Sequence, residues 1–554
     1  MTEDTSIRFT SAGAGTISVR RVFASVHDKT GLAEFGKFLT DRGIEIFATG
    51  GTASFLKENG IPVTKGEDLT GFGEILSGKV KSLSPRLHAS ILFDRASQTE
   101  AEQVRSQGLL PVDMVVVNFY PFERVPQDAP LAEALSMIDI GGPASLRAAA
   151  KNFRSVVPVP HPSVYGKVME DIIANSAIDR TPDGSRFPTG GPAAVSLSLS
   201  QELAIRVYET TASYDAAVSA GLGRRLGQEG RGVSVPERLC LVYRKASGLR
   251  YGENPHQAAG FYLPLRGGTG EALPFEQAQG KELSFNNLLD LAAAVCTCRE
   301  LVAPGCVIIK HKTPCGVAET ESPLAAFRLA RDCDPLSAFG GIVAVNRELT
   351  EDVAREMSGI FLEAVAAPGF TAGAMAFLSK KKNLRLLRLP PEAFRKPETP
   401  GRQLRSGPGG LLLQEEDSHP ETYGEWRVVS KTQPSDEQTR GLFFLWKVAR
   451  HAVSNAVVVG RGDATLGIGC GQTSRVDAVH MAVYKAGRAQ HDLRGALLAS
   501  DGFFPFRDSV DAAAAAGIAA VVQPGGSIRD RECIEAADEH GMVMCLTGRR
   551  CFRH

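Results

Sequence analysis

A lysine and a histidine stand side by side where a predicted strand ends. Val307, Ile308 and Ile309 form a short β-branched apolar run, which is typical of a buried strand. Lys310 and His311 follow this run directly. An imidazole can accept a proton at neutral pH, and a neighbouring ammonium group can stabilise negative charge that develops during a reaction. The pair is therefore a candidate for general-base catalysis with electrostatic assistance.

A simpler interpretation of the same pair is a solvated strand end. Pro314 and Gly316 are expected to stop regular structure soon after it, so the pair would lie in a loop. Loops on rigid scaffolds often carry chemistry, but an isolated Lys-His pair is more often an ordinary polar surface. We favour the catalytic interpretation because of the other motifs in the chain.

Length and composition exclude several classes of function. The chain has 554 residues, of which 43% are hydrophobic and 22% charged, as in a globular protein of about two to four domains. Lys+Arg and Asp+Glu are both 62, so bulk charge indicates neither nucleic-acid nor membrane binding, and anionic ligands need local cationic clusters. The apolar runs are too short to span a membrane, and the N-terminus lacks a signal-peptide core. We therefore expect a cytoplasmic protein.

The cysteines give no strong metal signal. The ten cysteines are scattered, with Cys296 and Cys298 as the only close pair. Cys315 follows Pro314 as in the P-C-x-x-C zinc motif of deaminases, but position 318 is Ala, so the second thiolate is missing. We predict reduced structural thiols and no metal site.

The N-terminal half alternates predicted strands, glycine-containing loops and helices, which favours a parallel α/β sheet. Residues 1–20 are predicted to form a flexible tail, and strands are predicted at 21–26 and 44–47. The second strand ends in the loop Thr49-Gly50-Gly51-Thr52, followed by a helix. The backbone N–H groups and hydroxyls of such a loop can bind phosphate, although many loops of this kind only turn the chain.

Further polar groups occur where this sheet would bind a ligand. Lys79 and Lys81 are two residues apart, on one face of an extended segment, and are either a solvated edge or part of a phosphate site. Asn118 and Tyr120 follow the apolar run 112–117. Ligands of open α/β sheets bind at the carboxyl ends of the strands, so this position is a candidate site.

Taken in order, the motifs make the chain similar to a known enzyme family. The N-terminal motifs are S-V-x-D-K-T-G, T-G-G-T, K-V-K, N-F-Y-P-F and I-D-I-G-G-P-x-x-L-R-A-A-A-K-N. The C-terminal motifs include L-R-Y-G-E-N-P-H-Q, G-K-E-L-S-F-N-N, the Lys310-His311 stretch, D-P-L-S-A-F-G-G, G-I-G-C-G-Q-T-S-R and S-D-G-F-F-P-F-R-D. From about residue 21 to its last residue, the chain resembles the bifunctional purine biosynthesis proteins, which combine AICAR transformylase with IMP cyclohydrolase.

The resemblance implies an α/β fold in two parts. An N-terminal Rossmann-like (methylglyoxal-synthase-like) domain with a parallel sheet would occupy residues 21–228, including a Gly/Arg-rich linker. A larger C-terminal domain of two cytidine-deaminase-like α/β lobes would occupy residues 229–554, although we see no short-period repeat in the sequence. Family members form dimers whose transformylase sites draw on both subunits, so the resemblance also implies a homodimer.

The transformylase of the family moves a formyl group from 10-formyltetrahydrofolate to the 5-amino group of AICAR. The resemblance makes His311 the base and Lys310 the electrostatic stabiliser, with Thr313 where much of the family has Asn. Folate is a co-substrate, and no tightly bound cofactor is implied. Positions that match the AICAR contacts are Arg250, Tyr251, Gly340, Glu363, Asn455, Arg475 and Arg550, and those that match the folate contacts are Val476, Phe503, Asp508, Ser527 and Ile528. Taken singly, each Arg is also compatible with a surface salt bridge, and Phe503 with a core position.

The cyclohydrolase of the family closes the formylated intermediate to IMP with loss of water. Lys151 matches the position that the family uses as a proton donor or acceptor. The other positions that match this site are Ser25, Lys29, Thr49, Gly50, Gly51, Thr52, Lys79, Lys81, Asn118, Tyr120, Asp139 and Ile140. All expected partners are small molecules, namely AICAR, formylated AICAR and folate, with no nucleic acid and no membrane.

Four positions depart from the family pattern: His27, Ala48, Lys79 and Ser84. His27 and Ala48 each replace a Ser, and an unreplaced hydrogen bond to a charged group costs ~1.5–3 kcal/mol. Lys79 keeps the charge of an Arg but loses its bidentate fork. We therefore expect a weakened cyclohydrolase, unless His27 supplies a cationic donor instead. The alternatives are a monofunctional transformylase with a degenerate nucleotide-binding N-terminal domain, and a nucleotide sensor without catalysis.

Overall fold

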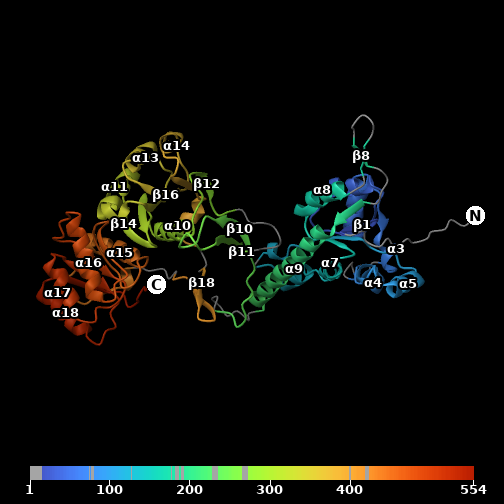
Figure 1. Cartoon of the computed structure of the whole chain (residues 1–554). Coiled ribbons are helices and arrows are strands. Elements are labelled where there is room, and N and C mark those ends of the chain that lie inside the picture. Colours follow the sequence, from blue (N-terminus) through green and yellow to red (C-terminus); the bar gives the residue numbers. More distant parts are fainter. Residues whose placement is uncertain are drawn as a thin grey trace, which may run out of the picture. The chain divides into compact units, whose positions relative to one another are not determined.

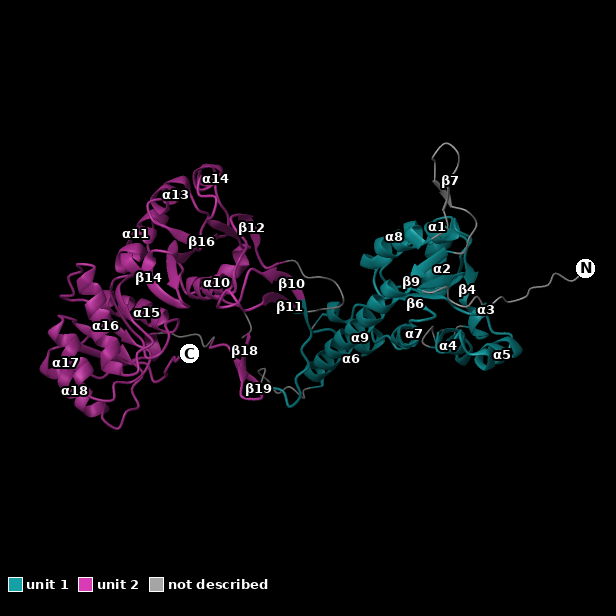
Figure 2. Cartoon of the chain, in the orientation of Figure 1, with its two compact units in different colours: residues 1–244, 264–271 teal, residues 245–263, 272–554 magenta. Residues whose placement is uncertain are grey.

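The chain forms two compact units in the computed structural model, one of residues 1–244 with 264–271 and one of residues 245–263 with 272–554 (Figures 1 and 2). The predicted boundary near residue 228 falls outside the described residues. The structure describes residues 15–73, 75–76, 80, 82–126, 128–175, 178–180, 186–188, 193–226, 235–264, 273–397, 401–417 and 423–554.

Unit 1 is built on a five-stranded sheet of order β4-β3-β2-β5-β6, in which every pair of neighbours is parallel. Its central strands are short apolar runs with residues buried on both faces, as is typical of parallel sheets covered by helices. This confirms the predicted parallel α/β sheet. The strands are β2 (Arg21–Ser25), β3 (Glu45–Ala48), β4 (Thr64–Lys65), β5 (Met114–Val117) and β6 (Val157–Val159).

Helices cover both faces of this sheet because successive strand residues point to opposite sides. Val22 and Ala24 of β2 lie in one core with α1, α2 and α8, whereas Phe23 lies in the other core with α4, α7 and α9. The helices are α1 (Leu32–Thr40), α2 (Gly50–Glu58), α3 (Gly66–Thr70), α4 (Pro85–Leu92), α5 (Gln98–Ser106), α6 (Leu131–Ser136), α7 (Gly141–Lys151), α8 (Tyr165–Asn175) and α9 (Leu197–Arg225), with short 3-10 turns η2 (Phe122–Arg124) and η3 (Pro162–Val164).

The predicted flexible tail is too long at its C-terminal end. Strand β1 (Thr16–Val19) pairs antiparallel with β9 (Ala193–Ser196). Its alternate residues Ile17 and Val19 are buried in the core of unit 1, and this burial orders the segment. The first 14 residues lie outside the described part of the chain, as do most residues around the short strands β7 (Ile178–Arg180) and β8 (Arg186–Pro188).

Unit 2 is built on one mixed sheet of 12 strands, in the order β12-β17-β16-β15-β13-β14-β22-β21-β23-β24-β25-β20. The strands are β12 (Glu276–Gln279), β13 (Gly305–Lys310), β14 (Thr313–Glu319), β15 (Gly341–Val345), β16 (Leu362–Ala367), β17 (Arg385–Arg388), β20 (Arg427–Val428), β21 (Val457–Arg461), β22 (Ala464–Gly469), β23 (Leu497–Ser500), β24 (Ala520–Gln523) and β25 (Val543–Leu546). Two further hairpins, β10 (Tyr243–Leu249) with β11 (Ala259–Pro264) and β18 (Arg402–Gly407) with β19 (Gly410–Glu415), form separate two-stranded sheets.

The strand order of unit 2 contains the same topology twice. Lobe A, residues 285–388, gives the order β14-β13-β15-β16-β17, and lobe B, residues 436–546, gives β22-β21-β23-β24-β25; the lobes meet where β14 pairs with β22. In each lobe an antiparallel hairpin is followed by three mutually parallel strands. Two related lobes are therefore present, and their likeness to cytidine deaminases stays a prediction.

Each lobe places one helix on one face of the sheet and the rest on the other. Helices α10 (Phe285–Cys298) and α15 (Asp436–Ala449) precede the two hairpins, and their residues share one core across both lobes. The opposite face carries α11 (Pro323–Cys333), α12 (Pro335–Ala338), α13 (Glu351–Met357) and α14 (Ala372–Leu378) in lobe A, and α16 (Arg475–Arg488), α17 (Asp508–Ala515) and α18 (Asp530–Glu539) in lobe B. None of the helices in the described ranges has the length and apolarity needed to cross a membrane.

The predicted strand before Lys310 is confirmed as β13, but the prediction that Pro314 and Gly316 end regular structure is wrong. Strand β14 runs through both residues and pairs with β13. The register shifts next to Pro314, and a proline is tolerated at such a bulge. Gly316 lies against α11, where an added Cβ would stand 1.7 Å from the carbonyl oxygen of Ala330, so this glycine permits the strand to pack.

Candidate active sites

The carboxyl ends of β2, β3 and β5 bring polar groups together at one edge of the unit 1 sheet. Ser25 ends β2, Thr49 follows β3 and Asn118 follows β5, and these strands are adjacent and parallel. The hydroxyl of Thr49 donates to Ser25 Oγ at 3.3 Å. Gly50 and Gly51 form the first turn of α2, where backbone N–H groups are not used by the helix and the helix dipole favours an anion.

Two side chains at this edge hold the loop after β2. Asn118 Oδ1 accepts from the backbone N–H groups of His27 at 2.7 Å and Asp28 at 2.9 Å, and its amide donates to the Asp28 carbonyl. The buried Thr52 hydroxyl bonds both the N–H and the carbonyl of Val26. Thr52 therefore fixes the loop with a hydroxyl that already has two partners.

A cavity of about 410 Å³ opens beside this loop. Of the residues predicted from the sequence, Lys29, Asn118 and Tyr120 line it together with His27, whose ring lies edge-on to Tyr120 at 5.1 Å. The cavity is also lined by residues that the sequence analysis missed: Arg124, His161, Thr210 and Tyr214. The signal for Arg124 and His161 is that they follow β5 and β6, at the same carboxyl edge.

Burial lowers the pKa of His27, and the nearby charges of Lys29 and Arg124 lower it further against the opposing effect of Asp28 and Asp139. Burial also lowers the pKa of His161, with Arg206 acting in the same direction. Both imidazoles therefore hold a proton less readily than a free histidine in the unliganded protein.

The three predicted residues around α7 are not all brought together. Asp139 Oδ1 accepts from Gly142 N–H at 2.8 Å, and the Asp139 N–H donates to the Tyr214 hydroxyl at 2.7 Å, beside an exposed Ile140. Burial raises the pKa of Tyr214 to about 12. Lys151 is exposed at the far end of the helix, and no hydrogen bond or ion pair among the described residues joins it to the others.

The departures from the family pattern have different structural outcomes. The Ala48 side chain is 1% exposed and packs in the core, so the expectation that it removes a hydroxyl from an open cradle is not supported. Ser84 caps α4, accepting from Arg86 N–H at 3.2 Å and donating to the Thr70 carbonyl at 2.7 Å. Lys79 and Lys81 lie outside the described residues.

In unit 2, Lys310 and His311 lie at the tip of the β13–β14 hairpin. Lys310 is the last residue of β13, and its ammonium donates to the carbonyl of Phe339. The next residue, Gly340, has a φ of 74° and donates its N–H to the Phe361 carbonyl at 2.8 Å. An added Cβ at Gly340 would stand 3.7 Å from Lys310 Nζ, so this ammonium and the D-P-L-S-A-F-G-G motif form one site.

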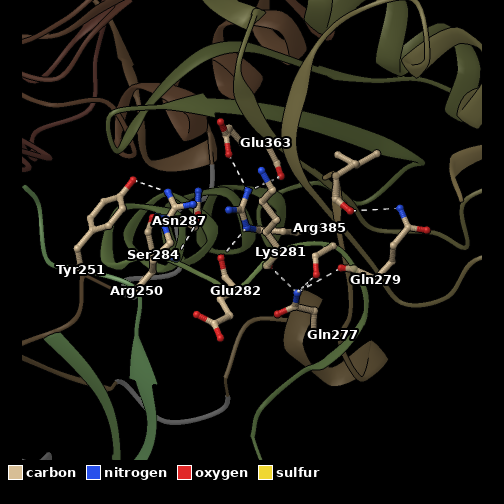
Figure 3. Close-up of polar contacts among 12 residues, drawn as sticks. Arg250, Tyr251, Gln277, Gln279, Lys281, Glu282, Ser284, Asn287, Glu363 and Arg385 are labelled. Carbon is tan, nitrogen blue, oxygen red and sulfur yellow. Dashed lines mark hydrogen bonds and ion pairs between the residues drawn. The ribbon is translucent and has the colours of Figure 1, made fainter. Parts of the chain in front are cut away.

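In the same lobe, the buried Arg385 forms an ion pair with the Glu363 carboxylate (Figure 3). The Arg385 side chain is 4% exposed and donates to Glu363 Oε2 at 2.7 Å and to the Glu282 carbonyl at 3.1 Å. The Glu363 side chain is 38% exposed, so it is anchored from within and still accessible. Arg385 was not predicted, because it belongs to no motif recognised in the sequence.

Arg250 and Tyr251 lie next to the G-K-E-L-S-F-N-N motif in the same view (Figure 3). The Arg250 guanidinium donates to the Tyr251 hydroxyl at 2.6 Å, and the Tyr251 carbonyl accepts from the N–H of Phe285. Ser284 and Asn287 form the capping box that begins α10. Arg250 and Tyr251, which precede lobe A, therefore lie against the start of α10.

Two of the remaining predicted AICAR contacts, Asn455 and Arg475, lie at one buried acid of lobe B, and Arg550 follows this lobe. Arg475 pairs with the fully buried Asp501 and donates to Asn455 Oδ1 at 2.8 Å. The Arg550 guanidinium lies 4.9 Å from the ring centre of Phe552. Asp501 was missed, although it belongs to the S-D-G-F-F-P-F-R-D motif.

The predicted folate positions lie after β23 and β24 or at helix starts. Phe503, 39% exposed, follows β23, and the loop with Ser527 and the exposed Ile528 follows β24; because these strands are adjacent and parallel, both segments lie at one sheet edge. Asp530 holds this loop by accepting from the N–H groups of Gly526 and Ser527. The remaining positions, Val476 and Asp508, lie in the first turns of α16 and α17.

The lobes are linked next to the Lys310-His311 hairpin. Burial raises the pKa of the Cys470 thiol, and a hydrogen bond with the Thr313 side chain opposes this effect.

All ten cysteines are free thiols. In the described part of the chain, no group of three or more His, Cys, Asp or Glu side chains is arranged to hold a metal ion.

The chain has two α/β units, each with its own sheet and its own candidate site. An MGS-like domain model matches residues 31–144, and an AICARFT/IMPCHase bienzyme model matches residues 149–485. The chain is 44% identical to the bifunctional purine biosynthesis protein PurH of Magnetococcus marinus over 97% of its own length and 99% of that protein. It is 44% and 45% identical to the PurH proteins of Persephonella marina and Anaeromyxobacter dehalogenans, over 97% of this chain and 100% of each relative. The chain therefore belongs to the AICARFT/IMPCHase bienzyme family.

Proposed function

We propose that the Lys310-His311 hairpin carries the transformylase activity of this bienzyme and that the carboxyl edge of the unit 1 sheet carries its cyclohydrolase activity. The two activities follow from the family, and the relatives match this chain across both units. A monofunctional transformylase is therefore not favoured. What is proposed is the assignment of each activity to particular residues.

The observation that carries the transformylase assignment is an exposed His311 beside a Lys310 whose ammonium is held at the Gly340 turn. In this mechanism His311 takes a proton from the AICAR amine while the amine nitrogen bonds to the formyl carbon. The Lys310 ammonium stabilises the oxyanion. The bond between the formyl carbon and the folate nitrogen then breaks, and that nitrogen receives the proton from His311.

The substrate contacts are divided between the two lobes. We assign the AICAR ribose and phosphate to Arg250, Glu363, Arg475 and Arg550, because a chain without net charge needs local cations to bind a phosphate. Phe503, Asp508 and the Ser527 loop are assigned to the folate, a co-substrate that carries the one-carbon unit. No tightly bound cofactor is required by this chemistry.

For ring closure, the substrate phosphate is assigned to the first turn of α2 with Lys29. Asn118, Tyr120 and Asp139 surround the base. The carboxamide nitrogen attacks the formyl carbon, and water leaves after proton exchange with the surrounding groups. Lys151 is retained as a proton-exchanging group on the strength of the family resemblance.

A homodimer is also proposed. The hairpins of unit 2 expose large apolar side chains, among them Tyr262 of β11 and Leu411 and Leu412 of β19, and such surface favours association. Light scattering across a dilution series would show a mass of two chains if this proposal holds. A single-chain mass at micromolar concentration would contradict it. The small-molecule substrates agree with a cytoplasmic location.

The decisive test of the assignment is His311→Ala. Formyl transfer from 10-formyltetrahydrofolate to AICAR should fall by ~10²–10⁴-fold, the usual contribution of a general base. Conversion of supplied formylated AICAR to IMP should not change, because the ring-closing residues lie in unit 1. Transfer that stays near the wild-type rate would remove His311 as the base.

A further inference from the structure

We propose that Asp290 is a positioning residue of the transformylase, whose carboxylate holds the backbone turn that presents His311. This inference rests on the proposed role of His311. Asp290 lies in α10, whereas the turn lies between β13 and β14, so the contact joins segments about 20 residues apart. Asp290 itself is not assigned to the substrate.

The turn that carries His311 has an unfavourable backbone for its residues. Lys310 pairs with Thr313, which leaves His311 and Lys312 as a two-residue hairpin loop. Both have positive φ, 52° for His311 and 64° for Lys312. Two-residue loops with positive φ at both positions are type I′ turns, which strongly prefer Asn-Gly, because other side chains clash with the backbone there. This hairpin therefore needs support from outside its own sequence.

Asp290 supplies that support through both carboxylate oxygens. The His311 N–H donates to Asp290 Oδ2 at 3.2 Å, and the Lys312 N–H donates to Oδ1 at 2.6 Å. The carboxylate therefore accepts from the N–H groups of both residues of the two-residue loop. Hydrogen bonds to an ionised acceptor are stronger than neutral ones, so the carboxylate favours the strained turn over other loop conformations.

The second lobe shows what the same hairpin looks like without a catalytic residue. The β21–β22 turn is Gly462-Asp463, and of these two only Gly462 has positive φ, at 55°. Asp290 and Gly441 each lie six residues after the serine that caps their helix, Ser284 in α10 and Ser435 in α15.

At the Gly441 position of lobe B the helix packs directly on the turn. A Cβ added to Gly441 would stand 2.5 Å from Cδ1 of Leu497 and 3.2 Å from the carbonyl oxygen of Gly462, so the helix lies close against the turn. The repeated fold thus closes this hairpin without a carboxylate. In lobe A the equivalent position is Asp290, and the turn that it bonds consists of two non-glycine residues, His311 and Lys312.

The helix that bears Asp290 is suited to holding a catalytic group in place. A complete capping box begins α10, and its inner face, including Leu291 and Ala294, is buried in the core shared by both lobes. The backbone of His311 is thus fixed to a rigid helix through Asp290. The neighbouring Lys310 side chain is held by the Phe339 carbonyl. Misplacing a catalytic group by about 1 Å can cost ~10²-fold in rate.

The first test is Asp290→Ala in the full-length enzyme. We expect kcat for formyl transfer to fall by roughly 10²-fold, with KM for AICAR changed little and conversion of formylated AICAR unchanged. Asp290→Asn, which keeps the shape but only one acceptor oxygen, should give an intermediate loss. The matched control is Asp492→Ala, because Asp492 also accepts from a backbone N–H of a turn, that of Arg494, on the exposed surface; its kcat should equal the wild-type value.

Two further variants distinguish positioning from general damage. In a His311→Ala background, Asp290→Ala should cause no additional loss, because a residue that acts only through His311 has nothing left to position. Lys312→Gly places a glycine where φ is positive, so it should restore part of the kcat of Asp290→Ala. A merely destabilised protein would show neither pattern.

The outcomes separate this inference from the proposed function. If His311→Ala leaves transfer intact, the proposed function fails. If His311→Ala abolishes transfer but Asp290→Ala keeps wild-type kcat, only the positioning inference fails. An additional loss from Asp290→Ala in the His311→Ala background, or no recovery with Lys312→Gly, would likewise overturn it, by showing that Asp290 acts independently of the turn.

Discussion

At the residue scale, each catalytic group depends on partners that fix its direction or charge. Lys310 is held by a backbone carbonyl rather than by an acid, so its charge remains available to a developing oxyanion. Burial lowers the pKa of His27, and the nearby charges of Lys29 and Arg124 lower it further. In the proposed mechanism, the cation of unit 2 acts on a transition state, whereas those of unit 1 act on a ground-state anion.

Lys310→Ala should reduce kcat for formyl transfer more than it weakens AICAR binding, because the proposed partner charge exists only in the transition state. Steady-state kinetics combined with calorimetric titration of AICAR would measure both effects. A loss confined to AICAR affinity would instead make Lys310 part of the ground-state site.

Ring closure should strengthen as the pH falls, if His27 contacts the substrate phosphate. Its pKa lies below the ordinary value in the free protein, and a bound phosphate favours the protonated form. KM for formylated AICAR should therefore decrease as the pH falls and His27 gains its proton, and rise as His27 loses it. His27→Ser, measured on the same substrate, should flatten this dependence. An identical pH profile for the two proteins would place His27 outside the site.

At the element scale, neighbouring strands of one sheet deliver groups from distant parts of the sequence. Glu363 comes from β16 and Arg385 from β17, which pair in parallel, and the guanidinium reaches across this pair. The guanidinium also bonds the Glu282 carbonyl, so the G-K-E-L-S segment is tied to the same carboxylate. One buried arginine thus holds together two parts of the proposed AICAR site (Figure 3).

Arg385→Lys should weaken AICAR binding by about 10-fold or more, since a lysine cannot bond both partners and a hydrogen bond to a charged group contributes ~1.5–3 kcal/mol. Arg388→Lys is the matched control, because this arginine of the same strand forms an exposed ion pair with Glu276. Exposed pairs contribute little, so its effect should be small. Equal effects of the two substitutions would show that Glu363 does not need its buried partner.

At the scale of the whole molecule, the two proposed sites belong to different compact units. Each unit has its own sheet and its own hydrophobic cores. The proposed sites accordingly share no described residue, and a defect in one need not disturb the other.

Two defective variants should therefore complement each other. A mixture of His311→Ala and Lys151→Ala proteins should convert AICAR to IMP, since the formylated intermediate made by the second protein can diffuse to the first. The rate of IMP formation, followed spectroscopically, should fall when the mixture is diluted at constant ratio. If the mixture forms no IMP although each protein keeps its other activity, the intermediate does not leave the protein that made it.

The sequence by itself determined the features that depend on neighbouring residues. The apolar run before Lys310 gave a strand, and the alternation of strands and helices in the first half gave a parallel sheet, because side-chain periodicity reports local burial. The ends of the strands before Thr49 and Asn118 were also predicted, and these residues lie at one sheet edge because parallel strands end together. The short strand inside the predicted tail was missed, because its partner lies more than 170 residues away.

Only the tertiary structure decided which distant residues support the sites. Asp290 and Arg385 carry no local signal, because each acts through hydrogen bonds to residues remote in sequence. Asp501 lies in a recognised motif, but its partner Arg475 is visible only in the folded chain. Pro314 and Gly316 were misread for the same reason: a bulge and a closely packed helix, neither visible in local pattern, let β14 pass through them. The two lobes were implied by the family resemblance but left no repeat in the sequence itself, since a repeated topology requires the same burial pattern but not the same residues.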